Sequence, residues 1–195
     1  MKIIQNDTIY QISNSIVNCY LVEEKDSLTL IDTGTAIFAK AIVSQAQLLK
    51  KPINRILFTH THVDHIGGLD KLISLLPSGP NLLCLPRSGE RVGSLQVIAT
   101  PGHTDDSMSF LDIRNRHLIV GDAMQTAGGV AVAGKIQLLF PLPGLATQNR
   151  MEAIKSAKKL LSFSPSLLAA GHGAMLPSPQ EAMRKAIFEA EKALK

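Results

Sequence analysis

The chain has 195 residues, 45% of them hydrophobic and 18% charged, a balance that suits one domain with a sizeable core and excludes a disordered chain. Much of the basic charge behind the formal net charge of +4 lies in helix-like C-terminal segments, and no compact basic run with interleaved aromatic residues predicts a nucleic-acid partner. No apolar run approaches the ~18–20 residues that a membrane span needs and the N-terminus lacks a signal-peptide pattern, so we expect a cytoplasmic protein without a membrane partner.

Alternating apolar residues indicate strands, whereas apolar residues spaced three and four apart indicate helices. One helix predicted in the first half has Thr35 as its N-cap and Pro52 after its end. In chain order, the predicted elements of the first half are strands over residues 8–12, 16–23 and 28–31, a helix over 36–51, a strand over 55–58 and a helix over 69–76.

In the second half, residues 125–143 are rich in glycine, low in charge and weakly patterned. The loop region over residues 125–148, the one plausible seam in the chain, is long for a structureless loop, which indicates a functional segment. Strand-rich halves that each carry helices favour an α/β (α+β) fold with helices outside two sheets, and no linker interrupts a single domain over residues 1–195. The predicted elements are strands over residues 81–85, 95–99, 108–112, 117–120 and 167–170, and helices over 149–163 and 179–195.

A cluster of metal-ligating side chains, His60-Thr61-His62-Val63-Asp64-His65, directly follows an apolar run. Residues two apart in an extended segment point to the same side, so we expect His60 and His62 to share one metal ion. Asp64 and His65, where the chain must turn toward a Gly-Gly pair, are placed to reach a second ion. Imidazole and carboxylate ligands favour zinc, iron or manganese over calcium.

Three further residues with ligating side chains, His103, Asp122 and His172, lie where the chain passes into glycine-flanked loops. Glycine lets the backbone turn tightly, and loops from one edge of a sheet can converge on one cleft. A lone Gly-Asp is more often a turn, but together with the histidine cluster these residues predict one metal-binding cleft. His117 lacks this setting and is expected to be an ordinary strand-start residue.

The motifs, in this order, resemble those of the metallo-β-lactamase-fold hydrolases over essentially the whole chain. The resemblance implies a four-layer αββα sandwich, in which two facing sheets carry helices on both outer faces. It also implies a site for two divalent metal ions, zinc above all, with iron or manganese as alternatives. The matching motifs are Asn18-Cys19-Tyr20-Leu21, Asp32-Thr33-Gly34, His60 to His65, Pro101-Gly102-His103-Thr104, Gly121-Asp122 and Gly171-His172-Gly173.

The resemblance also assigns a role to each of the polar residues in these motifs. Asp32 would orient the ligands without touching a metal, although ending its strand at a turn would alone account for it. Metal 1 would be bound by His60, His62 and His103, metal 2 by Asp64, His65 and His172, and Asp122 would bridge the two.

Two cations at such a site would supply a hydroxide near neutral pH, because they lower the pKa of a bound water to ~7. The hydroxide would attack the carbon of a carbonyl group or the phosphorus of a phosphoryl group, while one ion polarises the oxygen of that group. Asp64 is placed to hold the hydroxide and to pass a proton to the leaving group, which makes it the predicted catalytic residue. The sequence thus predicts a binuclear metal-dependent hydrolase.

Substitutions typical of other branches of this family are missing. Its β-lactamases commonly have Arg or Ser in place of His65 and Cys in place of Asp122, and its diiron flavoproteins have Glu in place of His62. The intact pattern groups with thioesterases of the glyoxalase II type, acyl-homoserine lactonases and tRNA 3′-processing nucleases. Because no RNA-clamping insertion is evident, we expect a small ester, lactone or thioester as substrate; the oligomeric state is not indicated.

The apolar segment that follows Asp122 contains Phe140, which we interpret as part of a substrate pocket, with packing into the core equally compatible. Three alternative functions remain on the same fold: a mono-iron sulfur (persulfide) dioxygenase, a phosphodiesterase or nuclease, and a non-catalytic metal-binding scaffold. Metal content and a panel of substrates distinguish them.

Overall fold

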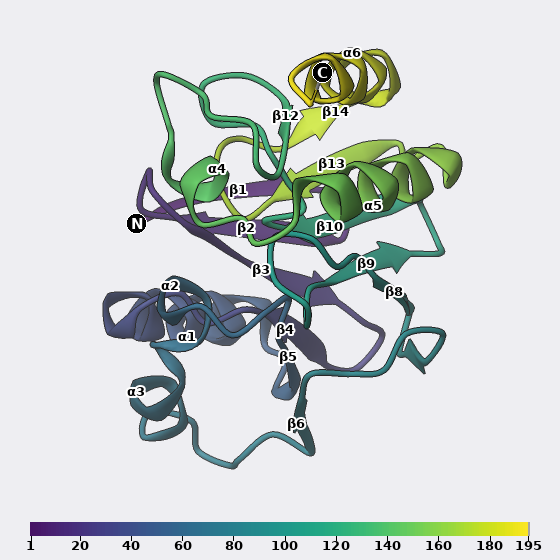
Figure 1. Ribbon diagram of the computed structural model, residues 1–195. Helices are drawn as coiled ribbons and strands as arrows, with labels where there is room; N and C mark the ends of the chain where they lie inside the picture. The colour runs from purple at the N-terminus through teal and green to yellow at the C-terminus, as the bar shows by residue number, and fades with distance from the viewer. Residues whose placement is uncertain (195) are drawn as a thin grey trace. The chain divides into compact units, whose positions relative to one another are not determined.

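The computed structural model (Figure 1) describes residues 1–194, and for residues 82–84 and 142 it describes the backbone only. The chain divides into two compact units, Met1–Pro86 and Arg87–Lys195, each with its own sheet and core. Lys195, at the end of the last predicted helix, lies outside the described residues. Among the described residues, no helix combines the length and the apolar character that crossing a lipid bilayer requires.

A six-stranded sheet forms the centre of the first unit. The elements of this unit are β1 (Lys2–Asn6), β2 (Ile9–Ser13), β3 (Asn18–Glu23), β4 (Leu28–Ile31), η1 (Ala36–Phe38), α1 (Ala39–Leu49), β5 (Ile53–Leu57), α2 (Val63–Ile66), α3 (Leu69–Ile73) and β6 (Leu82–Cys84). The strands follow their sequence order across the sheet, antiparallel from β1 to β4 and parallel from β4 to β6. Helical crossovers join the parallel strands, as parallel pairing requires.

The parallel pairing of β4 with β5 brings two polar strand ends to one edge of the sheet. Ile31 stands opposite Leu57 in the register, so the residues that follow each strand leave the sheet next to one another. The backbone N–H of Asp32 extends the ladder by donating to the Leu57 carbonyl at 2.9 Å. This edge therefore places Asp32 beside the start of the histidine cluster.

Helices pack on this sheet through an apolar stripe that begins in η1 and continues through α1. Phe38, Ile42 and Ala46 are spaced four apart, so they lie on one helix face, and all three are buried. Leu72 of α3 joins the same core, and the sheet contributes several buried side chains, among them Leu21, Leu28, Leu30 and Ile56.

A second six-stranded sheet forms the centre of the second unit. Its elements are β7 (Arg91–Val92), β8 (Leu95–Ala99), β9 (Met108–Asp112), β10 (His117–Gly121), β11 (Met124–Gln125), β12 (Ala131–Val132), α4 (Leu142–Leu145), α5 (Arg150–Ser162), β13 (Leu167–Ala170), β14 (Leu176–Pro177) and α6 (Gln180–Lys192). The sheet order is β14-β13-β10-β9-β8-β7, and β11 and β12 form a separate two-stranded sheet.

Three strands of the second sheet run in the same direction. β10 pairs parallel with β13 and antiparallel with β9, which itself pairs antiparallel with β8. The carboxyl ends of β8, β10 and β13 therefore open at one edge. His103, Asp122 and His172 each follow one of these three ends, so the topology gathers three residues that are far apart in the sequence.

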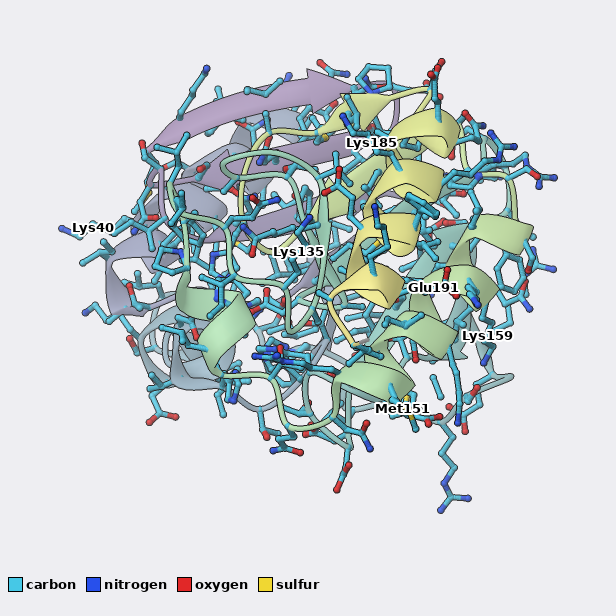
Figure 2. The ribbon with its side chains drawn as sticks, turned by 45° about the horizontal axis from the view of Figure 1, so that its top comes forward. Lys40, Lys135, Met151, Lys159, Lys185 and Glu191 are labelled. Carbon is cyan, nitrogen blue, oxygen red and sulfur yellow. The ribbon has the colours of Figure 1, made fainter. Side chains whose placement is uncertain are left out.

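Helices α5 and α6 pack against each other and against this sheet. The side chain of Asn149 caps α5 by accepting a hydrogen bond from the Glu152 N–H at 3.1 Å. α6 buries Met183 and Ile187 while Lys185 stays exposed (Figure 2). Its exposed basic side chains agree with the interpretation of the C-terminal charge as solvated helix faces.

The structure differs from the predicted elements where the pattern is short or its residues are exposed. β1 was not predicted, because it is an edge strand with side chains largely exposed, and backbone pairing with β2 alone defines it. The long first helix begins as the 3-10 turn η1, and the Thr35 side chain makes no capping bond. The Thr35 carbonyl instead accepts from the Phe38 N–H at 3.0 Å. α2 and α4 are single turns of four residues, too short to show a helical period.

Candidate metal centre

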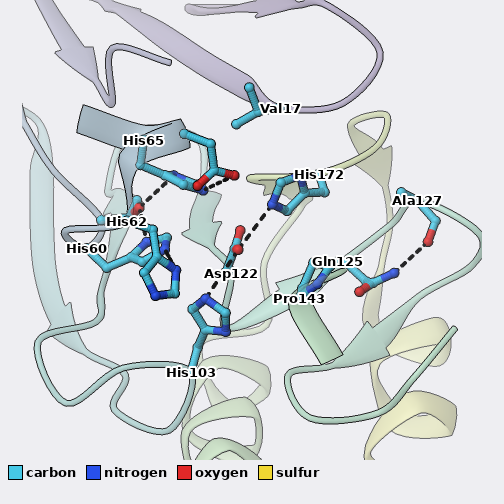
Figure 3. Close-up of polar contacts among 12 residues, drawn as sticks. Val17, His60, His62, His65, His103, Asp122, Gln125, Ala127, Pro143 and His172 are labelled. Carbon is cyan, nitrogen blue, oxygen red and sulfur yellow. Dashed lines mark hydrogen bonds and ion pairs between the residues drawn. The ribbon is translucent and has the colours of Figure 1, made fainter. Parts of the chain in front are cut away.

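Four of the seven expected metal ligands lie in the first unit, at the edge where β4 and β5 end. His60 and His65 are buried, whereas His62 and Asp64 are partly exposed. The rings of His60 and His65 lie 4.1 Å apart between centroids, and those of His60 and His62 lie 4.7 Å apart (Figure 3). The three imidazoles of this short segment thus lie close together.

The carboxylate of Asp32 positions this half of the site through hydrogen bonds. This carboxylate, 2% exposed, accepts hydrogen bonds from the Thr59 backbone N–H at 2.8 Å, the Thr59 hydroxyl at 2.7 Å and His65 Nδ1 at 2.7 Å. A neutral imidazole that donates through Nδ1 keeps its lone pair on Nε2. Asp32 therefore presents His65 in the tautomer that a metal ion needs at Nε2.

Thr59 sets the tautomer of His60 in the same way. Its single hydroxyl proton goes to Asp32, so its oxygen accepts from His60 Nδ1, 3.0 Å away. His60 Nε2 then carries the lone pair, and it lies 3.0 Å from His62 Nδ1. The first half-site thus places one nitrogen of each of these two rings within hydrogen-bond distance of the other.

The backbone around α2 is fixed by contacts with the loop after β4. The Thr33 N–H and the Thr33 hydroxyl both donate to the His65 carbonyl, at 2.7 and 3.1 Å. Gly68 fits closely under this loop, because a Cβ there would come within 2.5 Å of the Thr33 carbonyl oxygen. These contacts set the direction of Asp64, whose Oδ2 lies 3.9 Å from His65 Nε2.

The remaining ligands lie in the second unit, around the carboxylate of Asp122. His172 Nε2 lies 3.1 Å and His103 Nε2 lies 3.4 Å from Asp122 Oδ2, and all three side chains are buried (Figure 3). The strand ends in the second sheet bring these three residues together. His117 stays apart from them, buried at the start of β10 opposite Asp112, in agreement with its expected ordinary role.

His103 is held by a tight turn and by a threonine. Gly102 has φ +135°, and a Cβ at this position would collide with the backbone of Ala153 in α5. The Thr147 hydroxyl donates to the Pro143 carbonyl at 2.7 Å, so its oxygen accepts from His103 Nδ1 at 3.2 Å. The lone pair of His103 is again on Nε2, the atom that faces Asp122.

His172 is fixed through its backbone. Its carbonyl oxygen accepts from the N–H groups of Thr126 and Ala127, at 3.0 and 3.2 Å, while the Thr126 hydroxyl donates to the Ala174 carbonyl at 2.7 Å. Gly173 has φ +104°, and a Cβ there would collide with the same segment. The Phe140 ring lies over the imidazole, 5.0 Å from it between centroids.

The distances within each half-site fit the ligand shell of a metal ion. For Zn–N bonds of about 2.0–2.1 Å, two ligands of a tetrahedral ion are roughly 3.3 Å apart. The His60–His62, His172–Asp122 and His103–Asp122 atom pairs are 3.0, 3.1 and 3.4 Å apart. Nitrogen and oxygen donors without sulfur suit zinc, iron or manganese, so the residues present fit such an ion.

Strand β3 carries two further buried ionisable groups, which lie near Asp32. Burial raises the pKa of the Cys19 thiol well above its usual value, and the Asp32 charge raises it further. Burial also raises the pKa of the Tyr20 hydroxyl, which accepts a hydrogen bond from Asn18 at 3.3 Å. Both groups therefore stay protonated and uncharged behind the histidines at neutral pH.

The threonines that set the imidazole tautomers, Thr59 and Thr147, were not identified from the sequence. Thr59 directly precedes His60, a position that offers a signal, since a hydroxyl can bridge a carboxylate and an imidazole. Thr147 lies 44 residues from His103 in the sequence, and only the fold brings its hydroxyl to the ring.

Comparison with known protein families identifies the family of this chain. The family model described as the metallo-beta-lactamase superfamily matches residues 13–79 and 85–172. The chain belongs to the metallo-β-lactamase superfamily. The matched residues include every expected metal ligand, and membership places the chain among metal-dependent hydrolases.

Individual relatives extend this assignment. The chain is 41% identical to "Uncharacterized protein YobT" of Bacillus subtilis, with 98% of this chain and 100% of that protein covered. It is 33% identical to a hydroxyacylglutathione hydrolase of Francisella tularensis subsp. novicida over 60% of this chain and 51% of that protein. The chain thus spans about half the length of this enzyme.

Solved structures share the fold at low sequence identity. TMB-1 has a TM-score of 0.74 at 16% identity, with 100% of this chain and 98% of that chain covered. TTHA1623 in a di-iron-bound form has a TM-score of 0.66 at 23% identity, with 88% and 95% covered. The predicted mixed α and β fold class, that of the metallo-β-lactamase superfamily, is thereby confirmed.

Proposed function

We propose that the protein is a hydrolase whose two half-sites together hold two divalent metal ions. The observation that carries this proposal is the common tautomer of the ligands. Three imidazoles, from both units, have Nδ1 bonded to a fixed oxygen and Nε2 directed at a further candidate ligand. The proposed ligands are His60, His62, Asp64 and His65 from the first unit, and His103, Asp122 and His172 from the second.

The proposed site also explains why the chain would act as a single domain over residues 1–195. Neither unit supplies enough ligands for two ions, because a catalytic zinc usually takes three protein ligands. We assign His60, His62 and His103 to one ion, Asp64, His65 and His172 to the other, and Asp122 to both. Zinc is the proposed ion, and iron or manganese would fit the same donors.

When bound, a pair of divalent ions lowers the pKa of water and polarises a substrate oxygen. The residues of the chain supply the remaining requirements. Asp32 and Thr59 hold the imidazoles in position, so that the site needs little rearrangement to act. Asp64 is partly exposed at the mouth of its half-site, where we propose that it carries a proton to the leaving group.

The proposed substrate is a small ester, lactone or thioester. Phe140 supports this choice, because its ring lies 5.0 Å from the His172 ring between centroids and so places an apolar side chain beside this ligand. The similarity to hydroxyacylglutathione hydrolases, enzymes named for a thioester substrate, favours thioesters within this class.

The test is a panel of esters, lactones, thioesters and phosphodiesters, assayed after reconstitution with zinc, manganese or iron. We expect hydrolysis of at least one carboxylic ester, lactone or thioester, and its loss in His62→Ala. Undiminished activity of His62→Ala would refute the assigned role of this residue. One iron per chain with oxygen consumption on a persulfide would instead identify a dioxygenase, and preferred cleavage of phosphodiesters would identify a phosphodiesterase.

A further inference from the structure

Gln125 is a buried amide in the second unit that no metal-binding role explains. Its side chain is 3% exposed, at the end of β11, three residues after Asp122. Nε2 donates to the Ala127 carbonyl at 2.8 Å (Figure 3) and also donates to the Phe140 carbonyl at 3.1 Å. Both amide hydrogens are thus used, and they join the start of the following loop to its far end.

The far end of this loop is a tight turn with an apolar tip, Leu138–Leu139. Gln137 and Phe140 pair as an antiparallel bridge, and the Phe140 N–H donates to the Gln137 carbonyl at 3.0 Å. Leu138 is 96% and Leu139 85% exposed. Packing into the core therefore accounts for neither leucine.

The apolar tip is continuous with the half-site through Phe140. The Phe140 ring lies tilted by 41° against the His172 ring, 5.0 Å away between centroids, and the Phe140 carbonyl accepts the hydrogen bond from Gln125. The neighbouring residue Thr126 fixes the His172 backbone. One short segment, Gln125–Thr126, thus holds both the imidazole and the apolar tip beside it.

The composition of the turn indicates what the tip would contact. Residues 136–149 contain no charged side chain. Residues 136–149 themselves offer no cation to an anionic group, whereas an uncharged hydrocarbon chain would gain from contact with the two exposed leucines.

We propose that Gln125 is a positioning residue that holds the apolar tip where it binds the uncharged acyl chain of the substrate. This inference rests on the proposed hydrolase function and names the part of the substrate that is selected. A merely structural Gln125 would affect folding stability and all substrates equally.

The test compares Gln125→Glu with wild type on thioesters of acetyl, butanoyl, hexanoyl and octanoyl groups. A glutamate keeps the size of glutamine but supplies at most one donor, whereas two carbonyl oxygens face this position. Burial of each methylene contributes up to about fourfold in affinity, so we expect the wild-type KM to fall with chain length. In Gln125→Glu we expect this dependence on chain length to flatten.

Two variants serve as controls for charge and for packing. Gln47→Glu makes the same substitution at an exposed position of α1 and is expected to keep the wild-type dependence. Gln125→Met removes both donors without adding charge and is expected to flatten the dependence in the same way. Thermal unfolding of each variant identifies any that fails to fold.

A second readout does not depend on hydrolysis. The chain has no tryptophan, so Leu139→Trp provides a single fluorescent reporter at the apolar tip. We expect its anisotropy to fall when Gln125→Met or Gln125→Glu is added, because the turn is released. Unchanged anisotropy together with an unchanged chain-length dependence would overturn the proposal.

The remaining outcomes separate this inference from the proposed function. A wild-type protein inert toward every ester, lactone and thioester would refute the hydrolase and, with it, the acyl-chain role of the tip. A dimer that Leu138→Asp dissociates without changing the chain-length dependence would overturn the proposal by making the tip an interface between copies.

Discussion

Replacing Asp32 tests whether the carboxylate positions the ligands or only ends a strand. Asp32 has φ +58°, a left-handed conformation that asparagine also tolerates. Asp32→Asn keeps the shape and the backbone, but replaces one acceptor oxygen by an NH2 group. Oδ2 accepts from both the Thr59 hydroxyl and His65 Nδ1, so at least one buried donor would face another donor.

The expected effects differ between two variants. In Asp32→Asn the His65 imidazole changes tautomer and places its proton on Nε2, so metal affinity should fall about 10- to 100-fold. In Asp32→Ala three buried donors lose their acceptor, at about 1–3 kcal/mol each, and alanine in a left-handed conformation adds about 1 kcal/mol. We expect the free energy of unfolding of this variant to fall by on the order of 5 kcal/mol.

The assay combines chelator competition for zinc with urea unfolding in excess chelator, so that metal affinity and apo stability are measured separately. Asp26→Asn, at an exposed turn, is the matched control and should match wild type in both measurements. An Asp32→Asn protein with wild-type zinc affinity would refute the orienting role of Asp32.

Three further outcomes follow from the structure. Gly102→Ala should lower the melting temperature much more than Gly89→Ala in thermal unfolding, because both have positive φ but only a Cβ at Gly102 would collide with α5; equal losses would contradict this. Thr147→Val should weaken zinc binding about tenfold in chelator competition, because His103 loses its acceptor, whereas Thr147→Ser should restore it; a tight-binding valine variant would contradict this. Cys19 should resist iodoacetamide at pH 8 until urea unfolds the chain, as peptide mass spectrometry would show, and labelling of the folded protein would contradict its burial.

The Cys19 thiol also predicts a direction for stability against pH. Burial raises its folded-state pKa above the value of about 8.5 in the unfolded chain. Its contribution to stability is therefore complete below that unfolded value and is lost as the pH rises above it. Urea unfolding of Cys19→Ser should show a weaker loss of stability than wild type between pH 8 and pH 10.

The sequence predicted the gathering of ligands because the relevant signals are local. Glycine-flanked polar residues after apolar runs predicted the strand ends, and parallel pairing then places such ends at one edge. The His60 to His65 spacing alone brought three imidazoles together. The positions of the long helices α1, α5 and α6 followed from their apolar period.

The parts that sequence reasoning missed depend on contacts between distant segments. Thr147 and Gln125 act through single hydrogen bonds to residues 44 and 15 positions away, and no periodic pattern encodes them. The edge strand β1 carries mostly exposed side chains, so no alternation of burial marks it. Short pairings such as β11 with β12 form only two-residue strands inside a segment without a pattern.

The count of metal ions in single and double variants tests the central proposal most directly. Zinc-reconstituted wild type should hold two ions per chain. His60→Ala and His103→Ala remove a ligand from different units, yet each should lose the same ion. The double variant should therefore lose no more than either single variant. Additive losses in the double variant, or no tightly bound ion in wild type, would contradict a site shared by the two units.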